Sequence, residues 1–316
     1  MSKFLVTGGA GFIGSNIVDE LVAMGHEVRV IDNFMTGKRE NLKDVIKKIE
    51  LVEGDIRDLD LMRKVTGGID FVLHQAAFRS VPKSVDNPTL NNDINVAGTL
   101  NALIAAEEAG VKKFVYASSS SCYGQTDIFP EQEDALPQPI SPYAVSKLTG
   151  EYYCKTFAAT YGLDTASLRY FNVFGPRQNP ESKYSTVIPI FIYRMLKDLS
   201  PIVNGDGEQS RDFTFVKNVV EANISAALTK TGCAGDVLNI ACGESHSVLD
   251  IVSNLNILMK KDIKPEFAPP RPGDVKKTHA DISKMKTKLN VTPKVGFKDG
   301  LERTLSWFMK NKVELA

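Results

Sequence analysis

The chain has 316 residues, of which 43% are hydrophobic and 24% charged, a composition typical of a soluble globular protein. Lysine plus arginine and aspartate plus glutamate both number 38, so net charge gives no reason to expect binding to nucleic acid or to an acidic membrane. The stretch MSKFLVTGG does not have the composition of a signal peptide, and no apolar run is long enough to span a bilayer. The four cysteines lack the spacing of metal ligands, so we expect reduced thiols, a cytoplasmic protein and no bound metal.

In the first 120 residues, short apolar runs that predict strands alternate with longer amphipathic runs that predict helices. The strand candidates are KFLVTG (3–8), EVRVID (27–32), IELVEGD (49–55), DFVLHQA (70–76) and KFVYASS (113–119). Helical patterns lie at residues 13–24, 41–48, 58–64 and 91–109. A further helix at 143–161 leads into DTASLRYFNVFG (164–175), which predicts a sixth strand and its exit loop. This alternation predicts an α/β fold of the Rossmann type, with a doubly wound parallel sheet.

The second half of the chain differs in texture, because Pro, Gly and Asn become frequent after Gly175. Shorter helices are predicted at 186–197, 216–228 and 247–259, and we interpret this part as a smaller, mainly α-helical lobe. RDFTFVKNVVEA (211–222) and DVLNIACGE (236–244) look like core elements that return to the sheet. We therefore expect one domain at 1–171 and about 212–250, and a second at about 172–211 and 251–316.

The motif TGGAGFIGS (7–15) places Gly8, Gly11 and Gly14 between the first strand and the first helix. Glycine permits the tight turn and the close approach of backbone N–H groups to a pyrophosphate, which the helix N-terminus also attracts. Asp32 ends the second strand 18 residues beyond Gly14, where a carboxylate binds the ribose diol of a dinucleotide. A carboxylate repels a 2′-phosphate, so NAD is favoured over NADP. Lys38 and Arg39 either temper this preference or simply begin a solvated helix.

Other strand ends extend the predicted cofactor site. GDIRD (54–58), after the third strand, suggests that Asp55 and Ile56 flank the adenine of the cofactor. QAAF (75–78), after the fourth strand, suggests a wall of small residues against the cofactor. With the Tyr–Lys pair described next, the predicted cofactor-binding residues are Gly8, Gly11, Phe12, Ile13, Gly14, Asp32, Asn33, Lys38, Asp55, Ile56, Gln75, Ala76, Ala77, Arg79, Asn95, Tyr143 and Lys147.

The motif SPYAVSK (141–147) carries Tyr143 and Lys147, which share one face of a helix at their i, i+4 spacing. A free tyrosine has a pKa of about 10, and nearby positive charge favours the phenolate that a general base requires. The run SSSSCYG (118–124) ends the fifth strand, and its serines are either a polar loop or hydroxyls aimed at a ligand.

TGGAGFIG, SPYAVSK, RYFNVFGPRQ (169–178) and RPGDV (271–275) together resemble the extended short-chain dehydrogenase/reductase family. Within it the chain looks like an NAD-dependent epimerase/dehydratase, and most of all like the UDP-N-acetylglucosamine 4-epimerases, from Thr7 to beyond Asp281. The resemblance implies a catalytic set of Ser119, Ser120, Tyr143 and Lys147, with bound NAD and a homodimer formed through the helices at 91–109 and 143–161. Similar sugar 4,6-dehydratases carry Asp–Glu where this chain has Ser120–Ser121, which favours an epimerase.

The resemblance also implies a UDP-sugar site in the second lobe. Its arginines match groups that hold the diphosphate, and guanidinium forks suit bidentate phosphate contacts. Galactose-restricted relatives place a tyrosine where Thr278 stands, so a small residue leaves room for a 2-acetamido group. The implied substrate-binding residues are Ser80, Ser119, Ser121, Asn172, Val187, Asn204, Arg211, Arg271, Asp274 and Thr278.

These matches favour 4-epimerisation of UDP-GlcNAc and UDP-GalNAc through a 4-keto sugar, with UDP-Glc and UDP-Gal as a second pair. One alternative is a UDP-glucuronate epimerase or decarboxylase, for which Arg79 is the candidate cation for the carboxylate. The other is a non-catalytic NAD-sensing regulator. Such proteins typically lose the tyrosine or the lysine, whereas this chain keeps both.

Overall fold

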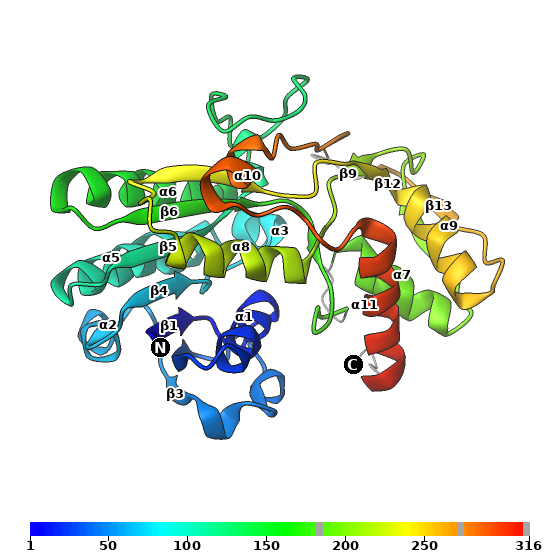
Figure 1. Cartoon of the computed structure of the whole chain (residues 1–316). Helices are drawn as coiled ribbons and strands as arrows, with labels where there is room; N and C mark the ends of the chain where they lie inside the picture. Colours follow the sequence, from blue (N-terminus) through cyan, green and yellow to red (C-terminus); the bar gives the residue numbers. More distant parts are fainter. Residues whose placement is uncertain (181–185, 271–274, 312–316) are drawn as a thin grey trace.

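The computed structural model describes residues 1–180, 186–270 and 275–311, and a parallel sheet of seven strands forms its centre (Figure 1). The strand order is β11 (Asp236–Ile240), β6 (Thr165–Tyr170), β5 (Lys113–Ser119), β4 (Phe71–His74), β1 (Lys3–Thr7), β2 (Glu27–Asp32) and β3 (Glu50–Glu53). The order reverses beside β1, and such a switch point opens a crevice at the carboxyl ends of the strands. The predicted Rossmann-type fold is confirmed.

Helices cover both faces of the sheet because successive strand residues point to opposite sides. In β1, Phe4 and Val6 belong to one apolar core and Leu5 to the other. The first core contains α1 (Phe12–Ala23) and α8 (Val216–Leu228). The second lies under α2 (Leu59–Thr66), α5 (Gly98–Glu108) and α6 (Pro142–Tyr161). The sheet is thus buried on both sides, as its Val- and Leu-rich strands require.

The six predicted strands are confirmed, but the helix predicted at residues 41–48 is wrong. This segment forms two short 3₁₀ turns, Arg39–Leu42 and Ile46–Lys48, because only Leu42 and Val45 of the segment are buried. Two buried side chains do not make the apolar stripe that stabilises a surface helix.

The helix predicted at 91–109 is interrupted. It consists of α4 (Pro88–Asn92), a π-helical turn at Asp93–Ala97, and α5. Such turns often occur at functional sites. Here the turn contains the buried side chain of Asn95, which contacts both the β4 exit and α6. A preceding short helix, α3 (Val81–Asp86), was not predicted from the sequence.

A group of helices lies beside the sheet, at the right of Figure 1: α7 (Val187–Leu196), α9 (Val248–Met259) and α11 (Phe297–Asn311). α10 (Ser283–Leu289) packs against β11 and α8. Short strand pairs join these parts, namely β7 (Val173–Phe174) with β10 (Thr214–Phe215), β9 (Ser210–Arg211) with β12 (His246–Ser247), and β8 (Ile202–Asn204) with β13 (Glu266–Ala268). The sequence did not predict α10 or α11.

The close packing of α6 on β5 depends on Gly150. A Cβ atom at this position would lie 2.3 Å from the Tyr116 ring, which is fully buried. The helix that carries Tyr143 and Lys147 can therefore approach the sheet only because residue 150 has no side chain.

We expect Gly150→Val to lower the free energy of unfolding by about 1–3 kcal/mol, the usual cost of overpacking a core. Chemical denaturation of the purified variant would measure this. Gly296→Val is the matched control, because nothing lies within 4 Å of a Cβ atom at residue 296. Equal stability of the two variants would show that Gly150 is not required for the packing.

Candidate functional site

The first part of the site is the glycine turn between β1 and α1. Gly8 has a φ of +66°, and a Cβ atom there would lie 2.7 Å from the backbone nitrogen of Ala76. A Cβ atom at Gly14 would lie 2.2 Å from the carbonyl oxygen of Gly8. Phe12 and Ile13 begin α1 directly after Gly11. The turn therefore offers a cradle free of side chains at a helix N-terminus, which fits the diphosphate of a dinucleotide.

Asp32 lies against this turn at the carboxyl end of β2. Its carboxylate accepts hydrogen bonds from the backbone N–H groups of Ala10, at 2.9 Å, and Phe34, at 2.8 Å. Burial raises the pKa of Asp32, while these two hydrogen bonds act to lower it. The carboxylate is thus held in a fixed position, in reach of a ribose beside the glycine turn.

A second group of predicted residues gathers where β2 and β3 end. The Asn33 amide donates to Asp55 Oδ2 at 2.8 Å. Arg57 binds both oxygens of Asp55, at 2.9 and 2.8 Å, and its hydrogen bonds are the main cause that lowers the pKa of Asp55 to about 2. Ile56 is buried. The sequence analysis missed Arg57, although it lies in the GDIRD motif that singled out Asp55.

The two basic residues whose roles the sequence left open lie near Asp32. The Lys38 backbone N–H donates to Ala10 O at 3.0 Å, so its chain closes over the glycine turn. The Arg39 guanidinium pairs with Glu53 and lies 4.1 Å from the centre of the Phe34 ring. Arg39 is therefore already engaged with an acid, which favours the solvated-surface interpretation for this residue.

The exit of β4 forms the wall of small residues. The Ala76 N–H donates to Thr7 Oγ1 at 3.1 Å, and Ala77 follows it. Gln75 donates to Asn223 Oδ1 at 3.0 Å, which ties the wall to α8. The buried Asn95 amide accepts from the Phe78 N–H at 2.7 Å and donates to Ser146 Oγ at 3.0 Å. These bonds position the wall, and a direct cofactor contact by Asn95 stays a prediction.

His74 was missed by the sequence analysis, although it supports the same wall. It lies fully inside the protein between Thr7 Oγ1, at 2.9 Å, and Thr99 Oγ1, at 3.1 Å. Burial lowers its pKa to about 3, so the imidazole is neutral and acts as a fixed hydrogen-bonding bridge beneath the glycine turn.

The predicted catalytic residues come together where β5 meets the start of α6. Ser119 hydrogen-bonds the side chain of Tyr143, and Ser121 Oγ donates to Ser119 Oγ at 2.9 Å. Ser120 begins the same short turn, Ser120–Tyr123, which follows β5. The hydroxyls of this run thus have different partners: Ser119 faces Tyr143 at the start of α6, Ser121 bonds Ser119, and Ser118 bonds Glu151 further along the helix.

Burial shifts the two key pKa values toward the neutral forms. It raises the pKa of Tyr143 to about 12, although the Ser119 hydrogen bond and the charge of Arg79 act to lower it. It lowers the pKa of Lys147 to about 8. Lys147 Nζ donates to Ala117 O at 2.8 Å and lies 6.0 Å from the centre of the Tyr143 ring. That Lys147 lowers the pKa of Tyr143 thus stays a prediction, which requires the ammonium to act across this gap.

Four of the predicted substrate residues line one cavity of about 340 Å³: Asn172, Val187, Asn204 and Arg211. The other walls are largely apolar and include Phe174, Phe191 and Phe213. A few polar groups at one end of an apolar cavity are typical of a small-molecule site. The sequence placed these four residues far apart, and the fold brings them together.

The remaining substrate residues have different positions. Thr278 Oγ1 lies next to the cavity, accepting from the Asp212 N–H at 3.1 Å and donating to Asn172 Oδ1 at 3.3 Å. Ser80 begins α3 with a φ of +127°, next to Arg79. Arg271 and Asp274 lie outside the described residues.

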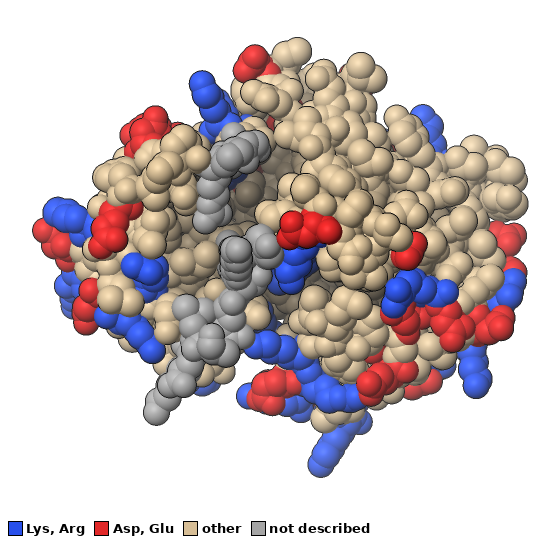
Figure 2. Space-filling view, turned by 180° about the vertical axis from the view of Figure 1, so that it is seen from behind, with Lys and Arg blue, Asp and Glu red and all other residues tan. Residues whose placement is uncertain are grey.

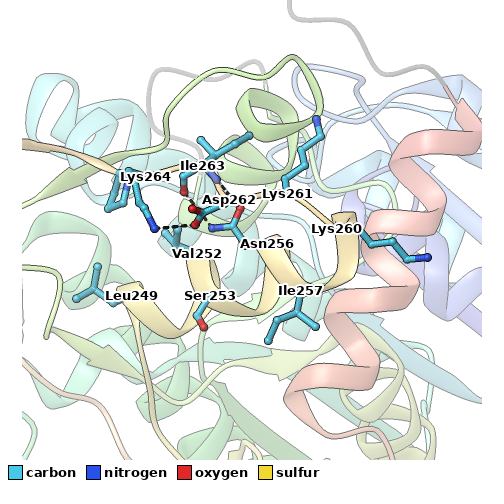
Figure 3. Close-up of a pocket in the computed structure, with 11 residues that line it drawn as sticks. Leu249, Val252, Ser253, Asn256, Ile257, Lys260, Lys261, Asp262, Ile263 and Lys264 are labelled. Carbon is cyan, nitrogen blue, oxygen red and sulfur yellow. Dashed lines mark hydrogen bonds and ion pairs between the residues drawn. The ribbon is translucent and has the colours of Figure 1, made fainter.

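A second cavity, of about 540 Å³, contains none of the predicted residues (Figure 3). It lies along α9 and residues 260–265. Some of its polar groups bind one another: Asn256 exchanges two hydrogen bonds with the Ile263 backbone, at 3.0 and 2.9 Å, and Lys264 pairs with Asp262 at 2.6 Å. The two cavities share no lining residue, so this one is separate from the cavity that contains Asn172 and Arg211.

The model of the NAD dependent epimerase/dehydratase family matches residues 4–241. The chain belongs to this family. It is accordingly an NAD-dependent enzyme, and the glycine cradle and Asp32 are the residues that fit this cofactor.

Solved structures of similar sequence extend over nearly the whole chain. A UDP-N-acetylglucosamine 4-epimerase from Methanobrevibacter ruminantium, in complex with UDP-N-acetylmuramic acid, is 40% identical with a TM-score of 0.94, covering 98% of this chain and 99% of that one. A UDP-glucose 4-epimerase from Thermotoga maritima, with UDP-glucose, is 39% identical with a TM-score of 0.93, covering 98% and 100%. Among relatives compared by sequence alone, a UDP-glucuronate 4-epimerase of Thermodesulfobacterium geofontis is 36% identical, covering 98% of this chain and 97% of that protein.

Charges of both signs lie on the surface of this family member. Lysines and arginines are interspersed with acidic residues on the face shown in Figure 2. Within residues 1–180, 186–270 and 275–311, no helix is long and apolar enough to cross a membrane. The same ranges contain no cluster of His, Cys, Asp or Glu that could hold a metal ion.

We expect the protein stripped of cofactor to bind NAD more tightly than NADP, and Asp32→Asn to narrow this preference by about 10–100-fold. The reason is that a hydrogen bond to a charged group contributes about 1.5–3 kcal/mol, and a neutral amide no longer repels a 2′-phosphate. Calorimetric titration of both proteins with both dinucleotides would measure this. Equal affinities in the unmutated protein would mean that Lys38 and Arg39 outweigh the carboxylate.

Proposed function

We propose that this protein interconverts the C4 epimers of UDP-sugars, and that its preferred pair is UDP-GlcNAc and UDP-GalNAc. The observation that carries the proposal is the position of the Ser119–Tyr143 pair where β5 meets α6. The protein also has a cavity lined by Asn172 and Arg211, which offers groups for a diphosphate. A nucleotide-sugar spans such an arrangement, with its hexose at the tyrosine and its diphosphate at the arginine and the amide.

Tyr143, as the phenolate, takes the proton of the 4-hydroxyl, and Ser119 donates a hydrogen bond to the same oxygen. NAD, when bound, supplies the hydride acceptor and later the hydride donor. The 4-keto sugar turns within the site while Arg211 and Asn172 hold the diphosphate. Tyr143 then returns the proton to the new alcohol. Since burial raises the pKa of Tyr143, the phenolate needs positive charge nearby, which Arg79 contributes. We propose that Lys147 adds to it.

The choice of N-acetylated sugars rests on Thr278. This residue is small, and its hydroxyl donates to Asn172 at the edge of the cavity. The resemblance in sequence, rather than this hydrogen bond, assigns it to the 2-substituent of the sugar. UDP-Glc and UDP-Gal would serve as a second pair, because a site with room for an acetamido group also admits a hydroxyl. The similar epimerase from Methanobrevibacter ruminantium adds support for a UDP-GlcNAc pair.

UDP-glucuronate is the second candidate substrate, and Arg79 is the observation that favours it. Burial of the guanidinium lowers the pKa of Arg79, and this group is near enough to Tyr143 for each to shift the pKa of the other. A carboxylate at C6 of the sugar could pair with it. Separate incubations with UDP-GlcNAc, UDP-Glc and UDP-glucuronate, with products identified by NMR, would decide between these substrates. If protein that retains NAD converts none of these three sugars, the alternative of a non-catalytic NAD-sensing regulator is favoured.

We expect Tyr143→Phe to reduce kcat by about 10²–10⁴-fold, the range for loss of a general acid/base, while the fold and the NAD content stay unchanged. Steady-state kinetics together with the nicotinamide absorbance of the purified variant would measure both. Tyr161→Phe is the control, since that tyrosine ends the same helix on the surface. A kcat near the wild-type value in Tyr143→Phe would remove Tyr143 from the reaction.

We expect Thr278→Tyr to reduce kcat/KM for UDP-GlcNAc by about 10–100-fold and to spare UDP-Glc. An aromatic ring would occupy the acetamido volume, and overpacking costs about 1–3 kcal/mol. Parallel kinetics with the two sugars would measure this selectivity. An equal loss of both activities would indicate collapse of the pocket, and no loss of either would show that residue 278 does not face the sugar.

A further inference from the structure

A fully buried ion pair lies next to residues 118–123, the end of β5 and the short turn after it, which we call the serine turn. Glu151 of α6 and Arg169 of β6 have exposed fractions of only 3% and 2%. They form two parallel hydrogen bonds, from Nε to Oε1 at 2.9 Å and from Nη2 to Oε2 at 2.8 Å. The family motifs drew attention to Tyr143 and Lys147 on the same helix, but not to this pair.

Both ends of the serine turn contact this pair. Ser118, directly before Ser119, donates from its hydroxyl to Glu151 Oε1 at 2.5 Å. Tyr123, the last residue of the turn, has its ring centre 4.5 Å from the guanidinium carbon of Arg169. The Tyr123 hydroxyl also donates to the buried Asn239 at 2.7 Å. The turn that carries Ser119 is thus fixed at both of its ends.

The same pair is part of the catalytic helix. Tyr143, Lys147 and Glu151 follow one another at intervals of four residues, so they lie along one face of α6. Glu151 therefore connects the helix that holds Tyr143 with the turn that holds Ser119. The hydrogen bond between Ser119 and Tyr143 requires these two elements to stay in register.

Stability alone does not account for an ion pair in this place. Burying two charges costs several kcal/mol per ion, and well-packed apolar residues of similar volume are often as stable or more so. Within the described part of the chain, Arg169 Nη1 is also buried without a hydrogen-bond partner, which adds to the cost. What the pair provides is directional contact with Ser118, Tyr123 and β6, which apolar side chains would not reproduce.

We propose that Glu151 and Arg169 are positioning residues that hold the serine turn against α6, so that Ser119 stays within hydrogen-bonding reach of Tyr143. Neither residue touches the reacting atoms, so they act through Ser119. This inference rests on the proposed function, because it assigns the pair to the reaction of Tyr143.

The test replaces the polar cluster by apolar residues in the holoenzyme, as Ser118→Ala/Glu151→Leu/Arg169→Met. We expect this variant to fold, to retain NAD and to bind UDP with the wild-type affinity by calorimetry. Its kcat should fall by about 10²-fold with little change in KM, since a misplacement of ~1 Å near the reacting groups has an effect of this size. Thermal denaturation, cofactor content and steady-state kinetics provide the readouts.

The control is Lys113→Met, at the opposite end of the same strand, where Lys113 is buried in an ion pair with Asp164 at 3.1 Å. It should reduce stability and leave kcat unchanged. A wild-type kcat in the folded triple variant would overturn the proposal, as would an equal loss of kcat in Lys113→Met.

If the triple variant does not fold or loses NAD, Ser118→Ala decides the question, because it leaves the ion pair intact. A reduced kcat at an unchanged melting temperature supports the proposal, and an unchanged kcat overturns it. A wild-type enzyme that converts no UDP-sugar would instead contradict the proposed function itself. Loss of turnover in Tyr143→Phe with full activity in the triple variant would reject only the positioning role.

Discussion

The close packing of α6 against β5 is the constraint on which the rest of the site depends. Gly150 removes the side chain that would collide with Tyr116, and the helix can then lie directly on the strand. At this distance Lys147 reaches the carbonyl oxygen of Ala117, and Tyr143 reaches Ser119. A small increase in the separation would break both contacts, because each is a single hydrogen bond between the two elements.

Close packing also has an electrostatic consequence. It removes water from Tyr143 and Lys147, so the pKa of the tyrosine rises to about 12 and that of the lysine falls to about 8. Both changes favour the neutral forms, and a phenolate therefore depends on positive charge that is held nearby. Arg79 is one such group. An oxidised nicotinamide would be another, which would link the activation of Tyr143 to the presence of the cofactor.

The predicted substrate cavity is built differently, from short segments that are separated in the sequence. The exit of β6 supplies Asn172, α7 supplies Val187, and the short strands β8 and β9 supply Asn204 and Arg211. The rings of Phe174, Phe213 and Phe297 lie 5.6 to 6.3 Å apart behind them and give these segments a shared core. The polar side chains of Asn172, Asn204 and Arg211 are thus carried on an apolar base that is continuous with the core on one face of the sheet.

The sequence by itself determined the elements whose signals are local. Alternation of apolar runs with amphipathic ones predicted the sheet, and TGGAGFIGS and SPYAVSK predicted the cofactor turn and the start of α6. The predictions of the fold, the family and the NAD cofactor are confirmed. They rest on contiguous motifs, in which each residue type is required by the local backbone conformation. The same local reading failed at residues 41–48, where a helical pattern lacked enough buried side chains to form a helix.

Only the tertiary structure decided the contacts between distant segments. The pair of Glu151 and Arg169 joins a helix to a strand, and Thr278 bonds Asn172 across 106 residues of sequence. Asn95, predicted to touch the cofactor, has its amide bonded to the β4 exit and to α6. The hydrophobic periodicity of the sequence does not predict such contacts, because they depend on how the packed helices and strands direct buried polar groups toward one another. A buried polar group must find a partner wherever the fold places one, and that partner is fixed by three-dimensional position rather than by spacing along the chain.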